Sequence, residues 1–152
     1  MNEIVLHESS PQDDSRQYFH IDEMENSSRV KSYDLSGVCP EGFIESIVAS
    51  PGTIESSEMQ DTPAVLSSWH KSLSSGGKLK LYFMDSRNTF TEYVYNRMPI
   101  SDLNSTVFLS GSKSLHDMFE IRNALISIGF KIEKQGYLSH DHRIGFVHAS
   151  KK

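Results

Sequence analysis

The side chains best suited to chemistry in this sequence are a histidine and acid cluster and a single thiol. Asp141 stands between His140 and His142, and imidazole and carboxylate groups are both metal ligands. Adjacent residues in a turn point in different directions, and no second group of His or Cys in the sequence has ligand spacing. We therefore expect an exposed turn there and no metal site. Cys39 precedes Pro40 and is expected to be a loop thiol.

The serine and histidine residues form no known nucleophile motif. The sequence contains no G-x-S-x-G elbow, no P-loop and no H-E-x-x-H pattern. We expect His70 near the C-terminus of a helix, where a positive charge favours the helix dipole. We expect His116 in the first turn of another helix, facing water. Both histidines are therefore interpreted as structural.

Two strong helices must position any site. The first is expected to start at Thr62 and to end at Gly76, because glycine readily adopts the left-handed conformation that stops a helix. The second is expected to be capped by Ser114 and to end at Gly129. The region 86–110 is harder to interpret and predicts one short helix within a loop.

Short apolar runs between these helices predict strands. Strands alternating with helices, followed by a closing hairpin, imply an α/β fold with a mostly parallel sheet, covered on both faces, and one antiparallel strand. The expected strands lie at residues 4–6, 18–21, 30–33, 43–49, 78–83, 130–135 and 144–148.

Length and charge limit the classes of function. The 152 residues suit one domain, expected over residues 1–152. The net charge of −5 provides no global attraction to nucleic acid or to an anionic membrane. No stretch approaches the ~20 apolar residues that span a bilayer, and the N-terminus has no signal-peptide pattern. We therefore expect a soluble, cytoplasmic protein, in keeping with its single cysteine.

Several short motifs occur in the order found in class I S-adenosylmethionine-dependent methyltransferases. Residues 63–79 resemble the family segment "avL.ew.rvLkPGG.l", and residues 19–22 resemble "w..iD", which follows the first family motif. The resemblance implies a Rossmann-like class I methyltransferase fold with a C-terminal antiparallel hairpin and few helices. The remaining similar segments are residues 33–35 ("hDl"), 44–50 ("fD.I.as"), 54–56 ("LEH"), 81–85 ("l.vPD") and 124–130 ("L...GF").

The clearest departure from the family falls in the cofactor loop. The glycine-rich turn after the first strand is replaced by His7, Glu8, Ser9 and Ser10. In the family, glycine lets the backbone approach the cofactor closely, because no Cβ stands in the way. Glu8 also brings a negative charge near the place where the methionine carboxylate of the cofactor would lie, and like charges repel. We therefore expect a degenerate first motif.

Two aspartates remain in register with family positions. The resemblance implies that Asp22, at the end of the second strand, accepts hydrogen bonds from the ribose hydroxyls of the cofactor. Asp34 would be a second polar contact. The alternative interpretation is that both aspartates are ordinary polar residues at strand ends.

Loss of the glycines favours a catalytically degenerate methyltransferase-like domain that serves as a binding or assembly module, with a protein partner or a second copy. A candidate partner-binding patch comprises Phe90, Tyr93, Tyr95 and Phe108, although core packing would also explain these aromatics. The alternative function is an active methyltransferase with an atypical loop, for which S-adenosylmethionine would be the cofactor. Methyl transfer needs mainly alignment of donor and acceptor, so few residue types are diagnostic of it. A nucleotide- or sugar-binding protein is a third class, without a phosphate-binding loop to support it.

Overall fold

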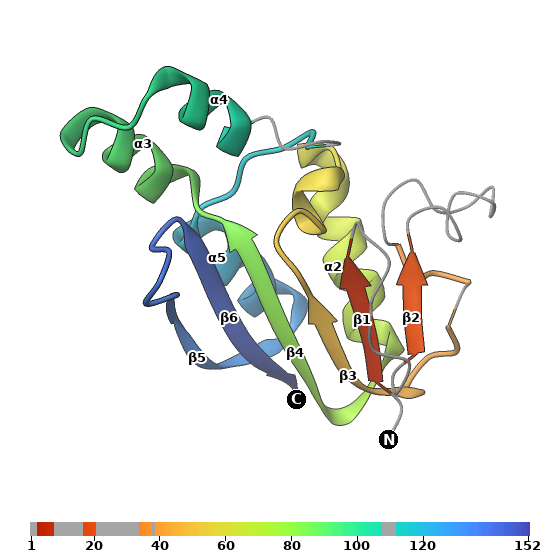
Figure 1. Ribbon diagram of the computed structural model, residues 1–152. Coiled ribbons are helices and arrows are strands. Elements are labelled where there is room, and N and C mark those ends of the chain that lie inside the picture. Colours follow the sequence, from red (N-terminus) through yellow and green to blue (C-terminus); the bar gives the residue numbers. More distant parts are fainter. Residues whose placement is uncertain (1–2, 8–16, 21–33, 38, 108–111) are drawn as a thin grey trace.

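The computed structural model describes residues 3–7, 17–20, 34–37, 39–107 and 112–152 (Figure 1). A six-stranded sheet in the order β2-β1-β3-β4-β6-β5 forms its centre. Strands β1 to β4 pair in parallel, and β6 is antiparallel to both of its neighbours, β4 and β5. The strands are β1 (Glu3–His7), β2 (Gln17–His20), β3 (Ile44–Ala49), β4 (Leu73–Met84), β5 (Phe130–Tyr137) and β6 (Ile144–Lys151).

Few helices accompany this sheet. Figure 1 shows α2 and α5 packed behind the sheet, whereas α3 and α4 extend beyond the upper ends of the strands. The helices are α2 (Thr62–Ser72), α3 (Ser86–Tyr95), α4 (Ile100–Val107) and α5 (Met118–Ile128), with 3₁₀ turns η1 (Ile54–Ser56) and η2 (Met59–Asp61). The mostly parallel α/β sheet with a C-terminal antiparallel hairpin confirms the predicted fold class.

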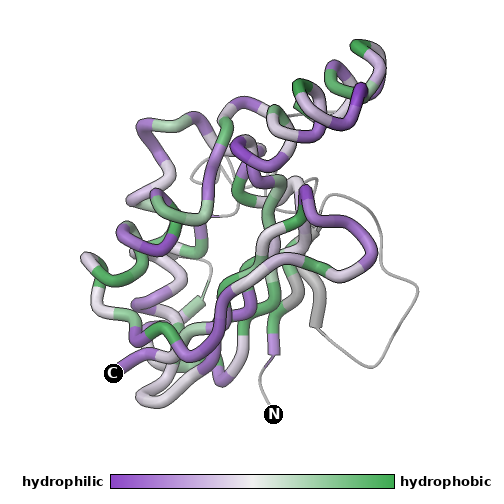
Figure 2. The backbone as a smooth tube through the Cα atoms, turned by 90° about the vertical axis from the view of Figure 1, so that its left-hand side faces the viewer, coloured by the Kyte–Doolittle hydropathy of each residue, from purple (hydrophilic) through white to green (hydrophobic). Residues whose placement is uncertain are grey.

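The core lies between the sheet and the helices behind it. Alternate β4 residues, Leu79, Leu81 and Phe83, are fully buried, because successive side chains of a strand point to opposite faces. They pack with residues of α2 and α5 such as Trp69 and Leu125. Figure 2 shows hydrophobic residues gathered on the strands and on the adjacent helices. The predicted apolar faces of β4 and of the first helix are therefore confirmed.

The first helix ends earlier than predicted. α2 stops at Ser72, and Leu73 already has the extended backbone of β4. The pairing of β3 with β4 shifts register between Ile44 and Ser46, and the extra β4 residues of that shift include Gly76. Gly76 has a φ of 74°, which favours glycine. This glycine therefore serves the irregular start of a strand and not the end of a helix.

Two other predictions about helices were wrong. α5 is capped by Asp117, whose side chain accepts a hydrogen bond from the Glu120 N–H at 2.8 Å, and not by Ser114. The region 86–110 contains a second helix, α4, in addition to the expected short one. In contrast, Gly129 ends α5 in the left-handed conformation, as predicted.

Some predictions concern residues outside the described part of the chain. They are the strand at 30–33 and the first crossover, at residues 8–16. The prediction that helices cover both faces of the sheet is wrong for β4, β6 and β5, because side chains on the face opposite α2 and α5, such as Lys80 and Lys134, are exposed. Among the described residues, no helix is both long enough and apolar enough to cross a membrane.

Candidate functional site

The ends of β1 and β3 are joined by hydrogen bonds to one carbonyl. The Leu6 carbonyl oxygen, at the end of β1, accepts bonds from the Ser50 N–H and hydroxyl at 3.0 Å each. It also accepts a bond from the Thr53 hydroxyl at 3.0 Å. A carbonyl oxygen has two lone pairs, so three donors use its full capacity. The loop after β3 therefore closes onto the end of β1.

Glu55 fixes the same loop from within. Its side chain is buried in η1, and one carboxylate oxygen accepts a hydrogen bond from the Gly52 N–H at 2.8 Å. The other oxygen accepts a bond from the Met84 N–H, at the end of β4, at 2.6 Å. Burial raises the pKa of the Glu55 carboxyl, while these bonds and the nearby His116 oppose the rise. Glu55 thus ties the ends of β3 and β4 together.

Asp85 occupies the corresponding position after β4. Its carboxylate is fully buried and caps α3 by accepting a bond from the Asn88 N–H at 2.8 Å. The second oxygen accepts bonds from the Met118 N–H at 2.9 Å and from the Tyr137 hydroxyl at 3.4 Å. Burial and then the Asp85 charge raise the pKa of the Tyr137 phenol. The starts of α3 and α5 are therefore anchored on one carboxylate.

A hydrogen-bonded chain of three side chains, with a fully buried histidine at its centre, lies next to Asp85. The Ser114 hydroxyl is 2.8 Å from His116 Nε2, and His116 Nδ1 is 2.9 Å from a Glu120 carboxylate oxygen. A serine, a histidine and a carboxylate in this order could activate the hydroxyl as a nucleophile. However, the His116 side chain has no exposed surface, so a substrate cannot reach the base. The chain of bonds therefore ties the segment before α5 to the first turn of that helix.

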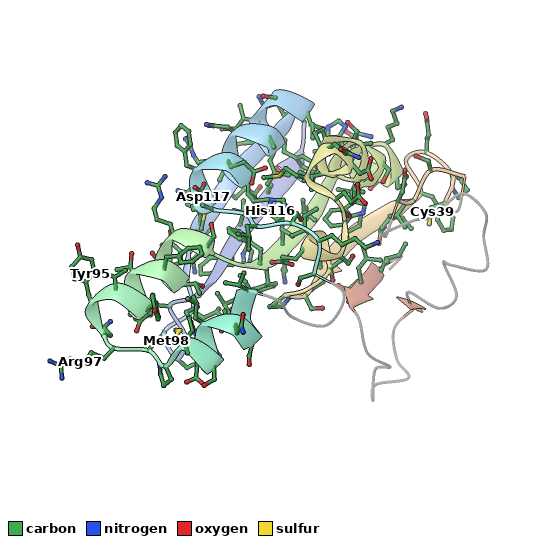
Figure 3. All side chains as sticks on the ribbon, turned by 90° about the horizontal axis from the view of Figure 1, so that it is seen from above. Cys39, Tyr95, Arg97, Met98, His116 and Asp117 are labelled. Atoms are coloured by element: carbon green, nitrogen blue, oxygen red, sulfur yellow. The ribbon has the colours of Figure 1, made fainter. Side chains whose placement is uncertain are left out.

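The burial of His116 contradicts its predicted position facing water. Because α5 starts only at Met118, His116 lies in the extended segment before the helix. That segment bridges to Asp85, and the His116 carbonyl accepts a bond from the Ser86 N–H at 2.8 Å. Figure 3 shows His116 in the interior and Asp117 closer to the surface.

The predicted cofactor-binding residues fall only in part within the described chain. His7 is the last residue of β1, and its backbone lies opposite His20 in the parallel pairing of β1 with β2. Asp34 is half-buried, and its carboxylate accepts a bond from the Ser36 N–H at 2.8 Å, in a local turn. Glu8, Ser9, Ser10 and Asp22 lie outside the described residues, so their roles stay predictions.

The other sequence candidates lie at the surface. His140 and His142 are exposed in the turn between β5 and β6, as predicted, and Asp141 makes a two-pronged ion pair with Arg143 at 2.9 Å. No group of three His, Cys, Asp or Glu side chains in the described ranges could hold a metal ion. Cys39 is half-buried, and burial raises the pKa of its thiol.

His70 occupies its predicted position near a helix C-terminus, but its surroundings oppose the positive charge that explained this position. The residue lies in the last turn of α2, as expected. However, burial and then the charge of Lys151 lower the pKa of its imidazole. Its ring meets the Phe130 ring edge-on, with centroids 4.9 Å apart. The neutral form is therefore favoured in the folded protein.

The predicted partner patch is exposed where it is described. Tyr95 is 78% exposed at the end of α3, and Phe90 and Tyr93 are also exposed on this helix. Figure 3 shows Tyr95, Arg97 and Met98 at the tip formed by α3 and α4, away from the sheet. Core packing is therefore excluded for these three aromatics, and Phe108 lies outside the described residues.

The sequence interpretation missed the importance of three buried groups. Glu55 and Asp85 were predicted only as family-like positions, although Asp85 directly follows β4 and Glu55 lies in the loop after β3, at the sheet edge where polar groups gather. His116 and Glu120 are spaced four apart, a spacing that brings side chains together on a helix, although His116 itself lies before α5. That spacing was the available indication of their contact.

The fold identifies the class of protein that this chain resembles. No protein-family model matches the chain, and no curated protein matches it. Solved structures do match, and the chain has a methyltransferase-like α/β fold. An S-adenosylmethionine-dependent methyltransferase from Mesorhizobium loti aligns with a TM-score of 0.55 at 16% identity, over 74% of this chain and 64% of that one.

Two further structures support the same fold. An S-adenosylmethionine-dependent methyltransferase from Thermotoga maritima, described as a possible histamine N-methyltransferase, has a TM-score of 0.52 at 16% identity, over 75% of this chain and 59% of that one. A possible exported protein from Bordetella parapertussis has a TM-score of 0.55 at 15% identity, over 74% and 40%. The chain thus spans less than two thirds of the length of each of these structures.

Proposed function

We propose that the chain, as one domain over residues 1–152, is a catalytically degenerate methyltransferase-like domain that serves as a binding or assembly module in the cytoplasm. The observation that supports this proposal most directly is the use of polar groups at the ends of β1, β3 and β4. The Leu6 carbonyl, the Glu55 carboxylate and the Asp85 carboxylate are all bonded to the protein itself. A cofactor placed against these strand ends would meet a Leu6 carbonyl whose lone pairs are already used and two carboxylates that are buried and bonded to backbone N–H groups.

The predicted replacement of the glycine-rich turn adds a second argument. Imidazole, carboxylate and hydroxymethyl groups at His7, Glu8 and Ser9 would shield the backbone that should approach S-adenosylmethionine. The described residues around Leu6 do not fit the cofactor. We therefore derive no methyl-transfer step from this site.

The exposed α3 and α4 tip supports a module that binds a protein partner or a second copy. Val94 and Ile100 are 64% and 63% exposed there, beside the more exposed Tyr95. Each of α3 and α4 contributes one buried residue, Thr89 and Leu103. Contiguous exposed apolar side chains at this scale are typical of interaction surfaces.

The competing function is an active methyltransferase with an atypical cofactor loop. The similarity to S-adenosylmethionine-dependent enzymes over three quarters of this chain supports that alternative. In it, Asp22 would bind the ribose, and backbone N–H groups around His7 to Ser10 would hold the cofactor.

Calorimetric titration with S-adenosylmethionine and S-adenosylhomocysteine distinguishes the two functions. The degenerate module should release no binding heat with either compound, whereas micromolar affinity for either would overturn the proposal. The variant with His7→Gly and Ser9→Gly tests the steric argument, because binding gained by this change would support loss of an inherited site.

Light scattering of the purified chain tests the assembly role. It should show a dimer, or a complex with a co-purified protein; a monomer without any partner would contradict the assembly role.

A further inference from the structure

The face of the sheet opposite α2 and α5 presents aromatic and basic side chains. On β4, the residues that alternate with the buried leucines are Lys78, Lys80 and Tyr82. The antiparallel register places Lys80 opposite His148 and Tyr82 opposite Phe146 on β6. Directly opposite residues of paired strands project from the same face, so these four side chains form one surface. In Figure 1 this face of β4, β6 and β5 is turned toward the viewer.

Three rings form the centre of this open face. The Phe146 centroid lies 5.2 Å from that of His148 and 6.3 Å from that of Tyr82. All three side chains are half-buried, so part of each ring reaches solvent. Gly136 of β5 pairs with Phe146, and a Cβ at Gly136 would lie 3.2 Å from the tip of the Phe146 ring. The glycine therefore lets the ring lie against the edge strand, with one side outward.

Lysines surround these rings. Lys78 and Lys80 lie on β4, Lys131 and Lys134 lie on β5, and all four are exposed. Lys134 Nζ is 5.7 Å from the Phe146 centroid. Glu133 pairs with Lys78 at 2.7 Å, and Glu3 and Glu45 line a hollow together with Lys78 and Lys80. The excess of positive charge is therefore confined to the part of the face around Phe146, where Lys80, Lys131 and Lys134 lie, although the whole chain has a net charge of −5.

His148 responds to these lysines. Burial lowers the pKa of its imidazole, and the charges of Lys80 and then Lys134 lower it further, while Glu133 opposes them. The ring is therefore neutral near pH 7 and acts as an aromatic surface. The phenol of Tyr82 lies 3.4 Å from His148 Nε2, which holds the two rings in place.

We propose that this face binds single-stranded nucleic acid, with bases stacked on Phe146 and its neighbouring rings and phosphates bound by the lysines. An aromatic platform on a sheet within a basic surround is the arrangement that accepts unpaired bases, because every base has a π-face. A second copy stacked on the same face would bring lysine against lysine. An acidic protein could pair its carboxylates with the lysines, but carboxylates would not stack on the three aromatic rings. Net charge alone predicted no nucleic-acid binding because it averages this face with an acidic remainder.

Binding can be measured by fluorescence anisotropy with a labelled oligothymidylate of about 12 nucleotides. The full chain should bind at low salt, and the logarithm of the association constant should fall with the logarithm of salt concentration with a slope of about −2 if three lysines contact phosphates. The double variant Lys80→Gln and Lys134→Gln should bind at least about tenfold more weakly. The matched control, Lys71→Gln with Lys113→Gln, removes two exposed lysines elsewhere and should bind like the unaltered chain.

Stacking is tested separately from charge. Phe146→Leu keeps an apolar side chain but removes the ring, and we expect about tenfold weaker binding with an unchanged circular dichroism spectrum. Tyr95→Leu, on the α3 tip, is the control and should bind normally. If Phe146→Leu unfolds the chain, Tyr82→Leu is the second variant for the same comparison. Absence of binding at low salt, or equal binding by both lysine double variants, would overturn the proposal.

Competition identifies the class of ligand. Polyglutamate and unlabelled oligothymidylate are compared as competitors for the labelled oligonucleotide. If polyglutamate competes equally well, the ligand is an acidic protein and the nucleic-acid proposal is overturned. This inference goes beyond the proposed function and uses another face of the sheet. A chain that binds S-adenosylmethionine could still bind the oligonucleotide. Calorimetry can therefore refute the proposed function without refuting this inference, and anisotropy can refute this inference without refuting the proposed function.

Discussion

The Asp85 carboxylate accepts a hydrogen bond from the Met118 N–H at 2.9 Å while its other oxygen caps α3. One side chain at the end of β4 therefore sets the start of α3 and, 33 residues later, the start of α5. Any change that alters this carboxylate acts on both helices at once.

Replacement of Asp85 by asparagine should destabilise the fold. The amide can still accept one bond, but its NH₂ group would face the Met118 N–H and leave that buried donor without an acceptor. We expect the free energy of unfolding to fall by about 1–3 kcal/mol, measured by urea denaturation. Asp102→Asn, at an exposed position in the first turn of α4, should change it by less than about 0.5 kcal/mol. Equal effects of the two changes would contradict the double-anchor role.

Glu55→Gln is expected to loosen the loop after β3. The glutamine amide can replace only one of the two carboxylate oxygens that accept from Gly52 and Met84, so a buried N–H group loses its partner. We expect a loss of about 1–3 kcal/mol in the free energy of unfolding, together with faster amide exchange at Met84. Glu58→Gln is the matched control, because Glu58 is exposed in the same segment. Unchanged exchange at Met84 in Glu55→Gln would refute this role.

The pair of Asp141 and Arg143 predicts a dependence of stability on pH. Hydrogen bonds from Arg143 lower the pKa of the Asp141 carboxyl in the folded state. The stability that this group contributes is therefore present above its unfolded pKa, near 3.8, and is lost as pH falls through the lower folded value. Thermal unfolding below about pH 4 should show this loss, and Asp141→Asn should make the decline shallower. Asp61→Asn, at an exposed position, should leave the dependence of stability on pH unaltered. An unaltered pH dependence in Asp141→Asn would exclude the coupling.

Gly145 is predicted to be sterically required. A Cβ at this position would lie 2.8 Å from the tip of the Phe83 ring, which is fully buried. Gly145→Ala should therefore reduce the free energy of unfolding by about 1–3 kcal/mol. Adding Phe83→Leu should relieve the clash, so the double variant should lose less stability than the sum of the two single changes. Strict additivity would show that the ring and the glycine do not interact.

The sequence predicted much of the sheet because hydrophobic alternation is a local property. Leu79, Leu81 and Phe83 show it directly, and Gly129 marks a helix end by its own conformational preference. The beginning of α5 was predicted wrongly because Ser114 and Asp117 are both good caps, and tertiary contacts decide between them. The backbone of His116 bridges to Asp85, just after β4, and accepts a bond from the Ser86 N–H, so the helix begins only at Met118.

The candidate site was less predictable for the same reason. Glu55 bonds to Met84, 29 residues away, and no local pattern in the sequence reveals that contact. The basic and aromatic face depends on which β4 residue lies opposite which β6 residue. Lys80 and His148 are 68 positions apart along the chain, and only the sheet register brings them together.

The position of β6 also has a consequence for the order in which the molecule assembles. β5 is made before β6, yet its neighbour in the sheet is β6, and β4 likewise receives β6 on its free side. During synthesis, β5 must wait without a strand partner until residues up to Lys151 have left the ribosome. β6, from Ile144 onward, is therefore the strand that completes this part of the sheet. A chain interrupted before Ile144 would leave one edge of β4 and one edge of β5 unpaired and open to pairing with other molecules.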